Sequence, residues 1–335
     1  MTIGERITVK SAGKINLYLN VSKKLRPDGY HEIKSIMQSV SLSDELTFSI
    51  TPSFGICRHP VSLYKGNDSK KFNSGYGSAP GKDADKNFQS NGISIECNNI
   101  DIPLNEKNLV HKAALLILKK FNLEKKYNIE INIKKSIPVS AGMAGGSTNA
   151  AATLVCLNKL LNLKLTEKEL QALGNEVGSD VPFCISGGTA LVEGKGEIVS
   201  RLPDMPFFWV VLAINGKKFS SGDVYDRFDL IGTERSSKHK TLVENLVQKK
   251  YSDFFSNIDN DLETVVSYED LMVDTLKNKA ITYGSFASQM TGSGPAVFAF
   301  CNDLSSAKKV CSGLGELTDK VFLSHTIPGS LNFLN

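Results

Sequence analysis

A glycine-rich segment at residues 137–151, with the sequence IPVSAGMAGGSTNAA, constrains the fold of this chain more than any other feature. Its glycines can adopt backbone angles that are closed to other residues, and they let a ligand approach the main chain. The alanine- and leucine-rich stretch that follows predicts a helix with an apolar face, and residues 147–149 offer hydroxyls and helix-capping groups at its start. Unpaired amides there lie at the positive end of the helix dipole. The segment therefore predicts a phosphate-binding loop.

The alternative for this segment is a flexible glycine loop followed by an ordinary helix cap. Pro138 fixes the entry to the loop, and the apolar face is long enough to anchor the helix in a core, so both features favour the phosphate site. The segment has neither the GxxxxGK[ST] pattern of a Walker A loop nor the GxGxxG pattern of a dinucleotide fold. A different nucleotide-binding fold is needed.

The composition limits the classes of function. A chain of 335 residues is long enough for two domains. Its net charge of +4 is small and does not indicate binding to nucleic acid or to an anionic membrane. We find no signal region and no apolar run of the ~20 residues that a spanning helix needs. The six cysteines show no CxxC spacing and are interpreted as reduced core residues. We therefore expect a cytoplasmic protein whose partner is a small metabolite.

The periodicity of apolar residues predicts a mixed α+β architecture in two lobes, at residues 1–202 and 203–335. A turn is predicted at residues 26–29, and a helix at 167–177 is expected behind a capping box. Residues 52–91 are rich in polar residues and glycine, so we expect a surface insertion that is partly disordered. Strands are predicted at 7–9, 15–21, 33–40, 46–50, 93–97, 129–133, 189–193, 207–214, 286–290, 296–300 and 320–324, with further helices at 108–121, between 220 and 279, and at 305–314.

A lysine and an asparagine near the start of the chain form a second candidate site. Lys14 and Asn16, in the sequence SAGKINL, occupy alternate positions of a predicted strand and so share one face. On an edge strand they would only be solvated. On a central strand they would point together into a cleft, and Ala12 and Gly13 would leave room beside them for a ligand.

Asp180 is a third candidate, in the sequence VGSDVPF between a predicted helix and an apolar, strand-like run. The simple interpretation makes Gly178 a helix C-cap and Asp180 a turn residue. However, the apolar neighbours of Asp180 would partly bury it, and a buried carboxylate needs a partner. Lys14 is the candidate for that partner.

A second loop of small residues, MTGSGPA at 290–296, lies between two predicted strands. A plain hairpin would explain it. Two glycine loops, one in each half of the chain, could also clasp a polyphosphate between the lobes, where ligand sites are common.

Together, the segments SAGKINLYLNV, PVSAGMAGGSTNAA and MTGSGPAVFAF are similar in order and spacing to the three motifs of the GHMP kinases, a superfamily that includes galacto-, homoserine, mevalonate and phosphomevalonate kinases. The resemblance implies an α+β, two-lobed GHMP kinase fold, with an N-terminal ribosomal-protein-like βα domain and a C-terminal ferredoxin-like α/β sandwich domain. Within the superfamily, RPDGYHE, GSDVPF and EGKGE resemble the branch that acts on 4-diphosphocytidyl-2-C-methyl-D-erythritol (CDP-methylerythritol) in the non-mevalonate pathway to isoprenoids.

That resemblance implies transfer of the ATP γ-phosphate to the tertiary 2-hydroxyl of CDP-methylerythritol. Asp180 matches the catalytic base, Lys14 its partner, and Asn16 a position that helps to hold the substrate. A tertiary alcohol is a poor nucleophile at neutral pH. A nearby carboxylate can take its proton, while a cation stabilises the developing charge.

The resemblance also implies the binding residues. Tyr30 and His31 match positions at the cytidine end of the substrate, and Tyr225 falls where the family stacks a ring on cytosine, although its SSG segment replaces the usual Ser-Thr-Ala. Magnesium is expected with ATP, and Ser147 is the candidate metal ligand. The implied ATP site comprises Asn108 and Lys135 near the adenosine and the loop residues Pro138, Ser140, Ala141, Gly142, Met143, Ala144, Gly145, Gly146, Ser147, Thr148, Gly292, Ser293 and Gly294.

Two other functions remain open from the sequence: another small-alcohol kinase of the superfamily, and a non-catalytic binding protein with the same fold. The RPDGYHE segment argues against the first, and the retention of both Lys14 and Asp180 argues against the second. The larger departure from the family is the polar insertion at 52–91, where a short connection is usual. We expect a monomer or a homodimer.

Overall fold

The computed structural model describes residues 6–53, 92–216 and 219–334. The predicted insertion at 52–91 lies outside these ranges except for its first two residues, and Cys57 lies outside them with it. The first half of the chain contains, in order, β1 (Arg6–Leu25), β2 (His31–Pro52), β3 (Ile93–Cys97), α1 (Leu109–Lys120), β4 (Tyr127–Lys134), α2 (Gly145–Leu160), α3 (Glu167–Val177), α4 (Val181–Ser186), β5 (Thr189–Gly194) and β6 (Ile198–Arg201). The second half contains β7 (Trp209–Ala213), α5 (Ser221–Ile231), α6 (His239–Val247), α7 (Tyr251–Phe255), β8 (Asp259–Asn260), α8 (Glu263–Glu269), α9 (Met272–Thr282), β9 (Ala287–Met290), β10 (Val297–Cys301), α10 (Leu304–Gly315), β11 (Val321–His325) and β12 (Leu331–Phe333).

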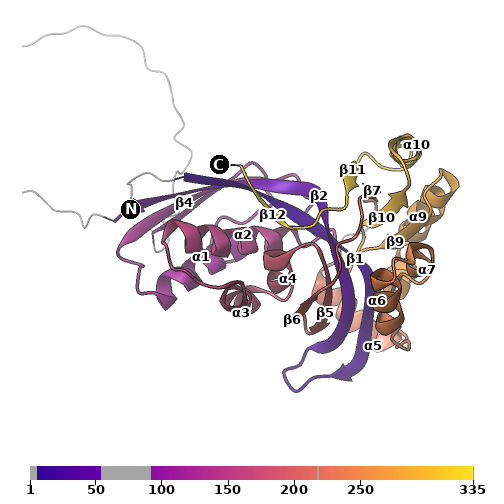
Figure 1. Cartoon of the computed structure of the whole chain (residues 1–335), viewed down its shortest axis with the longest axis horizontal. Helices are drawn as coiled ribbons and strands as arrows, with labels where there is room; N and C mark the ends of the chain where they lie inside the picture. The colour runs from indigo at the N-terminus through magenta and orange to yellow at the C-terminus, as the bar shows by residue number, and fades with distance from the viewer. Residues whose placement is uncertain (1–5, 54–91, 217–218, 335) are drawn as a thin grey trace, which may run out of the picture.

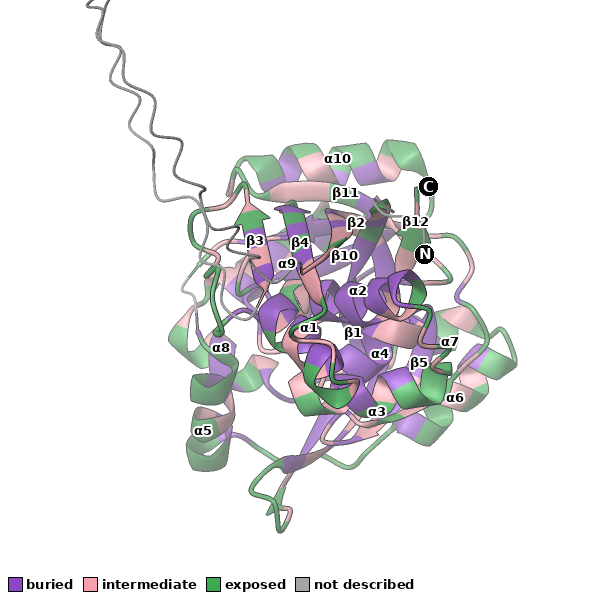
Figure 2. Ribbon diagram, turned by 90° about the vertical axis from the view of Figure 1, so that its left-hand side faces the viewer, coloured by how far each residue is buried: buried purple, intermediate pink, exposed green. Residues whose placement is uncertain are grey.

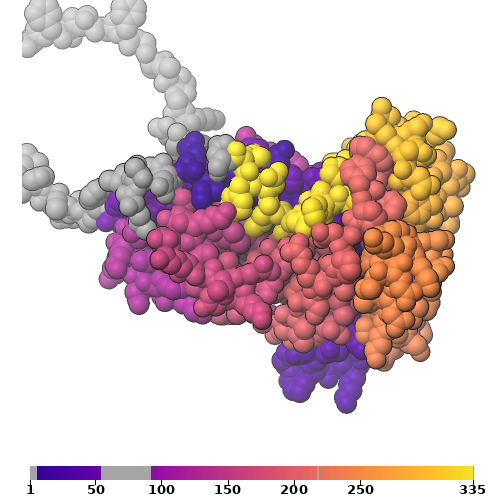
Figure 3. Space-filling view, viewed as in Figure 1, coloured from indigo at the N-terminus to yellow at the C-terminus, as the bar shows by residue number. Residues whose placement is uncertain are grey.

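A long antiparallel ribbon of β1 and β2 runs through the molecule and belongs to the first sheet (Figure 1). The strand order is β12–β1–β2–β4–β3. The C-terminal part of β2 pairs with β4, while its N-terminal part pairs with β5, which in turn pairs with β6. The predicted strands at 7–9 and 15–21 are one continuous strand, because a register shift between Ala12 and Lys14 accommodates the break in the apolar pattern. The predicted turn at 26–29 closes the ribbon, whose end extends below the rest of the molecule in Figure 3.

Helices α1 to α4 pack beside the first sheet and enclose the first hydrophobic core. Figure 2 shows their buried sides turned inward and their exposed sides turned to solvent. The predicted helix at 167–177 is α3, and its capping box is confirmed: the Thr166 hydroxyl accepts from the Glu169 amide, while the Glu169 carboxylate accepts from the Thr166 amide. Such reciprocal bonds satisfy two donors at the helix start.

The strand-like run after Asp180 was predicted wrongly, since residues Val181–Ser186 form helix α4. Pro182 lies in the first turn, where its missing N–H costs no intrahelical hydrogen bond. The run is short and almost entirely apolar, so it carries no helical periodicity that would distinguish it from a strand. Contact with α2 and α3, which buries Val181 and Phe183, decides the conformation.

The second sheet has the antiparallel order β11–β7–β10–β9, and its two faces enter different cores. Along β10, Val297 and Ala299 face the core shared with α9 and α10, whereas Phe298 and Phe300 face the ribbon. This alternation follows the two-residue period of a strand. On the ribbon side, Ile15 and Leu17 of β1 complete the core, which fixes the orientation of β1 next to the second sheet.

Two short strands from the second half of the chain join the first sheet. β8 pairs in parallel with β1, and β12 pairs antiparallel with its N-terminal part. Neither strand was predicted, because runs of two or three residues give no periodic signal.

The boundary between residues 202 and 203 remains a prediction. The predicted burial of the cysteines is confirmed for Cys156, Cys184 and Cys301, whereas Cys97 and Cys311 are only half-buried. That the cysteines are reduced remains a prediction. Within the described ranges, no helix has the length and apolar character needed to cross a membrane.

Candidate active site

One cleft of about 840 Å³ collects nearly all the residues singled out from the sequence. It is lined by the glycine loop, the middle of β1, the start of α1, the turn between β1 and β2, and the start of α5. Among the predicted site residues, Thr148 and Gly294 do not line it. Thr148 is buried and its hydroxyl accepts from Ser11 Oγ at 3.1 Å, while Gly294 packs on the side chain of Met290. Both face away from the cleft.

The first turn of α2 presents main-chain amides at this cleft. The helix begins at Gly145, and Ala144 occupies the N-cap position in the left-handed conformation, with φ of 56°. No side chain of the described residues caps it, so the prediction that residues 147–149 supply the cap was wrong. Those residues lie within the helix, and Asn149, its fifth residue, accepts from Ser11 Oγ at 3.1 Å. The uncapped amides and the dipole together favour an anion at this point.

The two glycine loops meet main chain to main chain. Gly142 has φ of 74°, and a Cβ there would overlap the carbonyl oxygen of Thr291. Gly292 has φ of 56°, and a Cβ there would lie 2.9 Å from the carbonyl oxygen of Gly142. Glycine is therefore required at both positions, by backbone conformation and by space.

Lys14 lies where the two loops meet β1. Lys14 pairs with Ser39 of β2 on one side, and on the other its amide donates to the Met143 carbonyl of the glycine loop at 3.1 Å, so it is not on a solvated edge. Since Ile15 and Leu17 face the second sheet, Lys14 and Asn16 point to the opposite side, into the cleft. The side chain of Lys14 is 5% exposed, and its Nζ donates to Asn16 Oδ1 at 2.6 Å and to the Gly142 carbonyl at 2.9 Å.

Asp180 completes this group from the start of α4. Its Oδ2 lies 3.7 Å from Lys14 Nζ, and its side chain is 32% exposed, so the predicted partner and the predicted partial burial are both confirmed. The preceding Gly178 is the residue after α3, as the simple interpretation required, but its φ of 179° is extended. The carboxylate is thus held beside an ammonium and remains open to the cleft.

Lys135 is held by a residue that the sequence did not reveal. Its ammonium forms an ion pair with Asp44 of β2, and both side chains are buried. Asp44 also accepts from the amides of Ser136 and Ile137, at 2.7 and 2.8 Å, and so fixes the chain that enters the glycine loop. The sequence did contain one indication of this role: Asp44 occupies a position of the strand where its neighbours on the same face are apolar. A buried charge is tolerated when paired in this way.

Asn108 lies across the cleft at the start of α1, where it is the N-cap. Its Oδ1 accepts from the Val110 amide at 2.9 Å, and its Nδ2 donates to the Pro103 carbonyl at 2.7 Å. The side chain therefore shapes the loop before α1, which also lines the cleft.

At the other end of the cleft, His31 and Tyr225 stack with ring centroids 5.3 Å apart and an interplanar angle of 24°. His31 Nδ1 lies 2.8 Å from the Ser22 carbonyl, which can only accept, so Nδ1 carries the hydrogen. Burial, and to a lesser degree the charge of Asp180, raises the pKa of the Tyr225 phenol, so the ring enters the site neutral. Tyr30, next to His31, is 53% exposed.

The rim at this end is built from ion pairs between two segments that are far apart in the sequence. Arg26 pairs with Glu32 at 3.0 Å and with Glu197 at 3.1 Å, and Lys195 lies 3.5 Å from Asp28. The Lys195 ammonium also lies 4.7 Å from the centre of the Tyr30 ring. The RPDGYHE and EGKGE segments are therefore one structural unit.

Comparison with known proteins defines the class first. The GHMP kinases N terminal domain matches residues 108–188, and the GHMP kinases C terminal domain matches residues 242–319. A solved 4-(cytidine 5'-diphospho)-2C-methyl-D-erythritol kinase shares the fold with a TM-score of 0.69 at 23% identity, covering 96% of this chain and 100% of that one. A homoserine kinase from Cytophaga hutchinsonii shares it with a TM-score of 0.69 at 17% identity, covering 100% and 99%. The predicted two-lobed GHMP kinase fold is confirmed.

The similarity in sequence is more specific. A 4-diphosphocytidyl-2-C-methyl-D-erythritol kinase of Clostridium botulinum is 36% identical over 95% of this chain and 99% of its own. One from Caldanaerobacter subterraneus is 34% identical over 98% of this chain and 100% of its own. The chain therefore belongs to the family of 4-diphosphocytidyl-2-C-methyl-D-erythritol kinases, which are ATP-dependent phosphotransferases. The prediction of the family is confirmed.

Proposed function

We propose that this chain transfers the γ-phosphoryl group of ATP to the 2-hydroxyl of CDP-methylerythritol. The observation that carries the proposal is the Lys14–Asp180 pair, 3.7 Å apart, in a cleft with an uncapped helix start at one end and stacked aromatic rings at the other. A nucleotide triphosphate suits the first end and a nucleoside the second.

Asp180 acts as the general base in this proposal. Its carboxylate faces the cleft and can take the hydroxyl proton as the new P–O bond forms. Lys14 is fixed by Asn16 and the Gly142 carbonyl, so its charge is already oriented toward the phosphoryl group before the reaction begins. Such preorganised charge stabilises the transition state of phosphoryl transfer.

The triphosphate of ATP lies along the glycine loop, with its oxygens accepting from the first amides of α2 and with Gly292 and Ser293 closing over it. Asn108 and Lys135 flank the adenosine. The tight contact between the two loops supports this arrangement, because it leaves backbone rather than bulky side chains beside the phosphates.

Magnesium accompanies ATP in the proposal. No group of three His, Cys, Asp or Glu side chains suited to a metal occurs in the described ranges, so the ion would be held mainly by phosphate oxygens and water. Ser147 Oγ, in the first turn of α2, is the protein oxygen that fits, since magnesium commonly binds with few protein ligands. When bound, the ion would neutralise charge on the phosphates.

The cytidine end is assigned to Tyr30, His31 and Tyr225. One face of Tyr225 is covered by His31, so cytosine stacks on its other face or on the exposed ring of Tyr30. His31 Nδ1 is occupied by the Ser22 carbonyl, so Nε2, 3.5 Å from Asp229 Oδ1, is the ring nitrogen assigned to the base edge. A cytoplasmic location, and a monomer or a homodimer, remain predictions.

A coupled assay of ADP release tests the proposed function with four substrates: CDP-methylerythritol, mevalonate, phosphomevalonate and homoserine. We expect turnover with CDP-methylerythritol and none above background with the others. Turnover with another alcohol would replace the substrate assignment. Absence of turnover with all four, in folded protein that binds ATP, would support the non-catalytic alternative.

A further inference from the structure

Asn260 is a buried asparagine that reaches the second glycine loop without lining the cleft. It is 1% exposed, and its Nδ2 donates to the carbonyls of Met290 and Gly292 at 3.0 and 2.9 Å. Its Oδ1 accepts from the Leu262 amide at 3.0 Å. Because both carbonyls can only accept and the amide N–H can only donate, the orientation of the side chain is determined.

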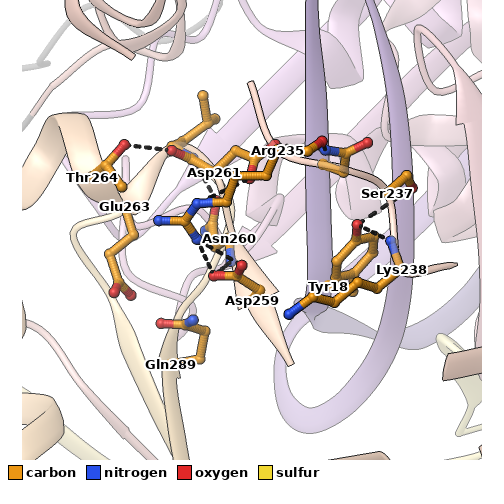
Figure 4. A network of polar contacts seen from close by, with 12 residues as sticks. Tyr18, Arg235, Ser237, Lys238, Asp259, Asn260, Asp261, Glu263, Thr264 and Gln289 are labelled. Atoms are coloured by element: carbon orange, nitrogen blue, oxygen red, sulfur yellow. Dashed lines mark hydrogen bonds and ion pairs between the residues drawn. The ribbon is translucent and has the colours of Figure 1, made fainter. Parts of the chain in front are cut away.

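The strand that carries Asn260 is anchored to the strand that carries Lys14. Asn260 in β8 pairs with Leu19 of β1. The next residue, Asp261, accepts from Asn20 Nδ2 at 2.8 Å and from the Val21 amide at 2.9 Å. Figure 4 shows Asn260 and Asp261 within a polar network that includes Tyr18 of β1. Asn260 is thus a fixed point with respect to β1.

Thr291 lies between the two carbonyls that Asn260 holds, and it reaches the atoms that position Lys14. It is fully buried, and its Oγ1 accepts from the Asn16 amide at 2.9 Å. The same Oγ1 lies 3.3 Å from Asn16 Oδ1 and 3.4 Å from the Gly142 carbonyl. These two oxygens are the acceptors of the Lys14 ammonium.

From this continuous set of contacts we infer that Asn260 is a positioning residue for phosphoryl transfer. Its amide holds the loop at Met290 and Gly292, so that Thr291 keeps Asn16 and the Gly142 carbonyl where they orient Lys14. The inference rests on the proposed function. An amide suits this role, since it supplies two donors to two carbonyls and one acceptor to an N–H. Aspartate, which is similar in shape, would place a negative oxygen against the carbonyls.

The first test measures kcat and KM for CDP-methylerythritol in Asn260→Ala and Asn260→Ser, beside the wild type. The serine variant keeps one hydrogen-bond donor, and it provides the test if the alanine variant does not fold. We expect kcat to fall by about 10- to 100-fold, since small displacements of a reacting group have effects of that order. KM for CDP-methylerythritol should change by less than about threefold, because the nucleoside end is untouched.

A control separates positioning from general destabilisation. Val310→Ala removes two methyl groups from the buried face of α10, in the core beneath the second sheet. It should lower the melting temperature and leave the kcat of the folded enzyme unchanged. If Asn260→Ala keeps kcat within about twofold of this control, the inference is overturned.

The second test examines the link through Thr291. Thr291→Val loses the hydroxyl and Thr291→Ser retains it, so we expect a loss of kcat in the first variant and recovery in the second. Combined with Asn260→Ala, Thr291→Val should cause little further loss, because both act through one loop. Independent, multiplicative losses, or full kcat in Thr291→Val, would contradict the inference. An inactive wild type would instead contradict the proposed function.

Discussion

The two ends of the cleft are built in different ways. The end proposed for the phosphates consists of main-chain atoms and buried side chains: two glycine loops in backbone contact, the first turn of α2, and a lysine that is 5% exposed. The end proposed for the nucleoside consists of side chains, with the buried His31 stacked on the half-buried Tyr225 under a partly exposed rim of ion pairs. Backbone geometry leaves little room for substitution, whereas exposed pairs contribute small, salt-screened energies. Changes at the first end should therefore be severe and those at the second graded.

The largest effect is expected at Asp180. Asp180→Asn keeps the shape of the side chain and removes the base, so kcat should fall by about 10²- to 10⁴-fold. ATP binding should persist, because the proposed phosphate site is formed by the amides of α2 and not by Asp180. An assay of ADP release measures kcat, and calorimetry with a non-hydrolysable ATP analogue measures ATP binding. Near-normal turnover would remove Asp180 from the role of base.

The second effect is expected at Asp44. Asp44→Ala leaves the Lys135 ammonium buried without its partner, which should lower the free energy of unfolding by about 3–5 kcal/mol. It also frees the chain at Ser136 and Ile137, so KM for ATP should rise in whatever fraction folds.

Urea unfolding checks this, with Glu45→Gln as the matched control. Glu45 is the neighbouring acid and pairs with the exposed Lys134, so its loss should change stability little. Equal effects at the two positions would show that burial of the Asp44–Lys135 pair has no special importance.

A smaller effect is expected at Tyr225. Tyr225→Leu removes a ring on which we propose that cytosine stacks. Aromatic stacking is worth about 0.5–1.5 kcal/mol, so KM for CDP-methylerythritol should rise by roughly 2- to 12-fold. KM for ATP should not change. Tyr268→Leu is the matched control, because Tyr268 is exposed in the same half of the chain, on α8. A rise in KM for ATP alone would place Tyr225 at the wrong end of the cleft.

The smallest effect is expected at the rim. Arg26→Gln breaks the pairs with Glu32 and Glu197, and KM for CDP-methylerythritol should rise by less than about threefold at physiological salt. Since exposed pairs are screened, the difference from wild type should vanish in about 1 M salt. Steady-state assays at both salt concentrations measure this. A loss of kcat would mean that the rim positions reacting groups.

The parts of the site that could be predicted from the sequence are those that have a recognisable local pattern. Lys14, Asp180 and the two glycine loops carry chemistry in recognisable local patterns, and the structure brings them together. Asp44 and Asn260 were missed because their roles depend on contacts with residues far along the chain. Asp44 stands at an apolar position of β2, which indicates burial but not its partner, and Asn260 lies in a strand of two residues that gives no local signal.

Local patterns also failed where tertiary packing decides the conformation. Val181–Ser186 is helical because it packs on α2 and α3, not because of its own periodicity. Likewise, α2 begins ahead of the predicted capping residues, and Thr148 and Asn149 are instead bound by Ser11 of β1.

The position of the transferred phosphate tests the proposed reaction most directly. With CDP-methylerythritol and ATP, ³¹P NMR of the product should show one new phosphomonoester without three-bond coupling to hydrogen, because the tertiary carbon at position 2 bears none. The signal should be absent with Asp180→Asn. A coupled phosphomonoester, or free phosphate in place of a new ester, would contradict the assignment of Lys14 and Asp180 to transfer at the 2-hydroxyl.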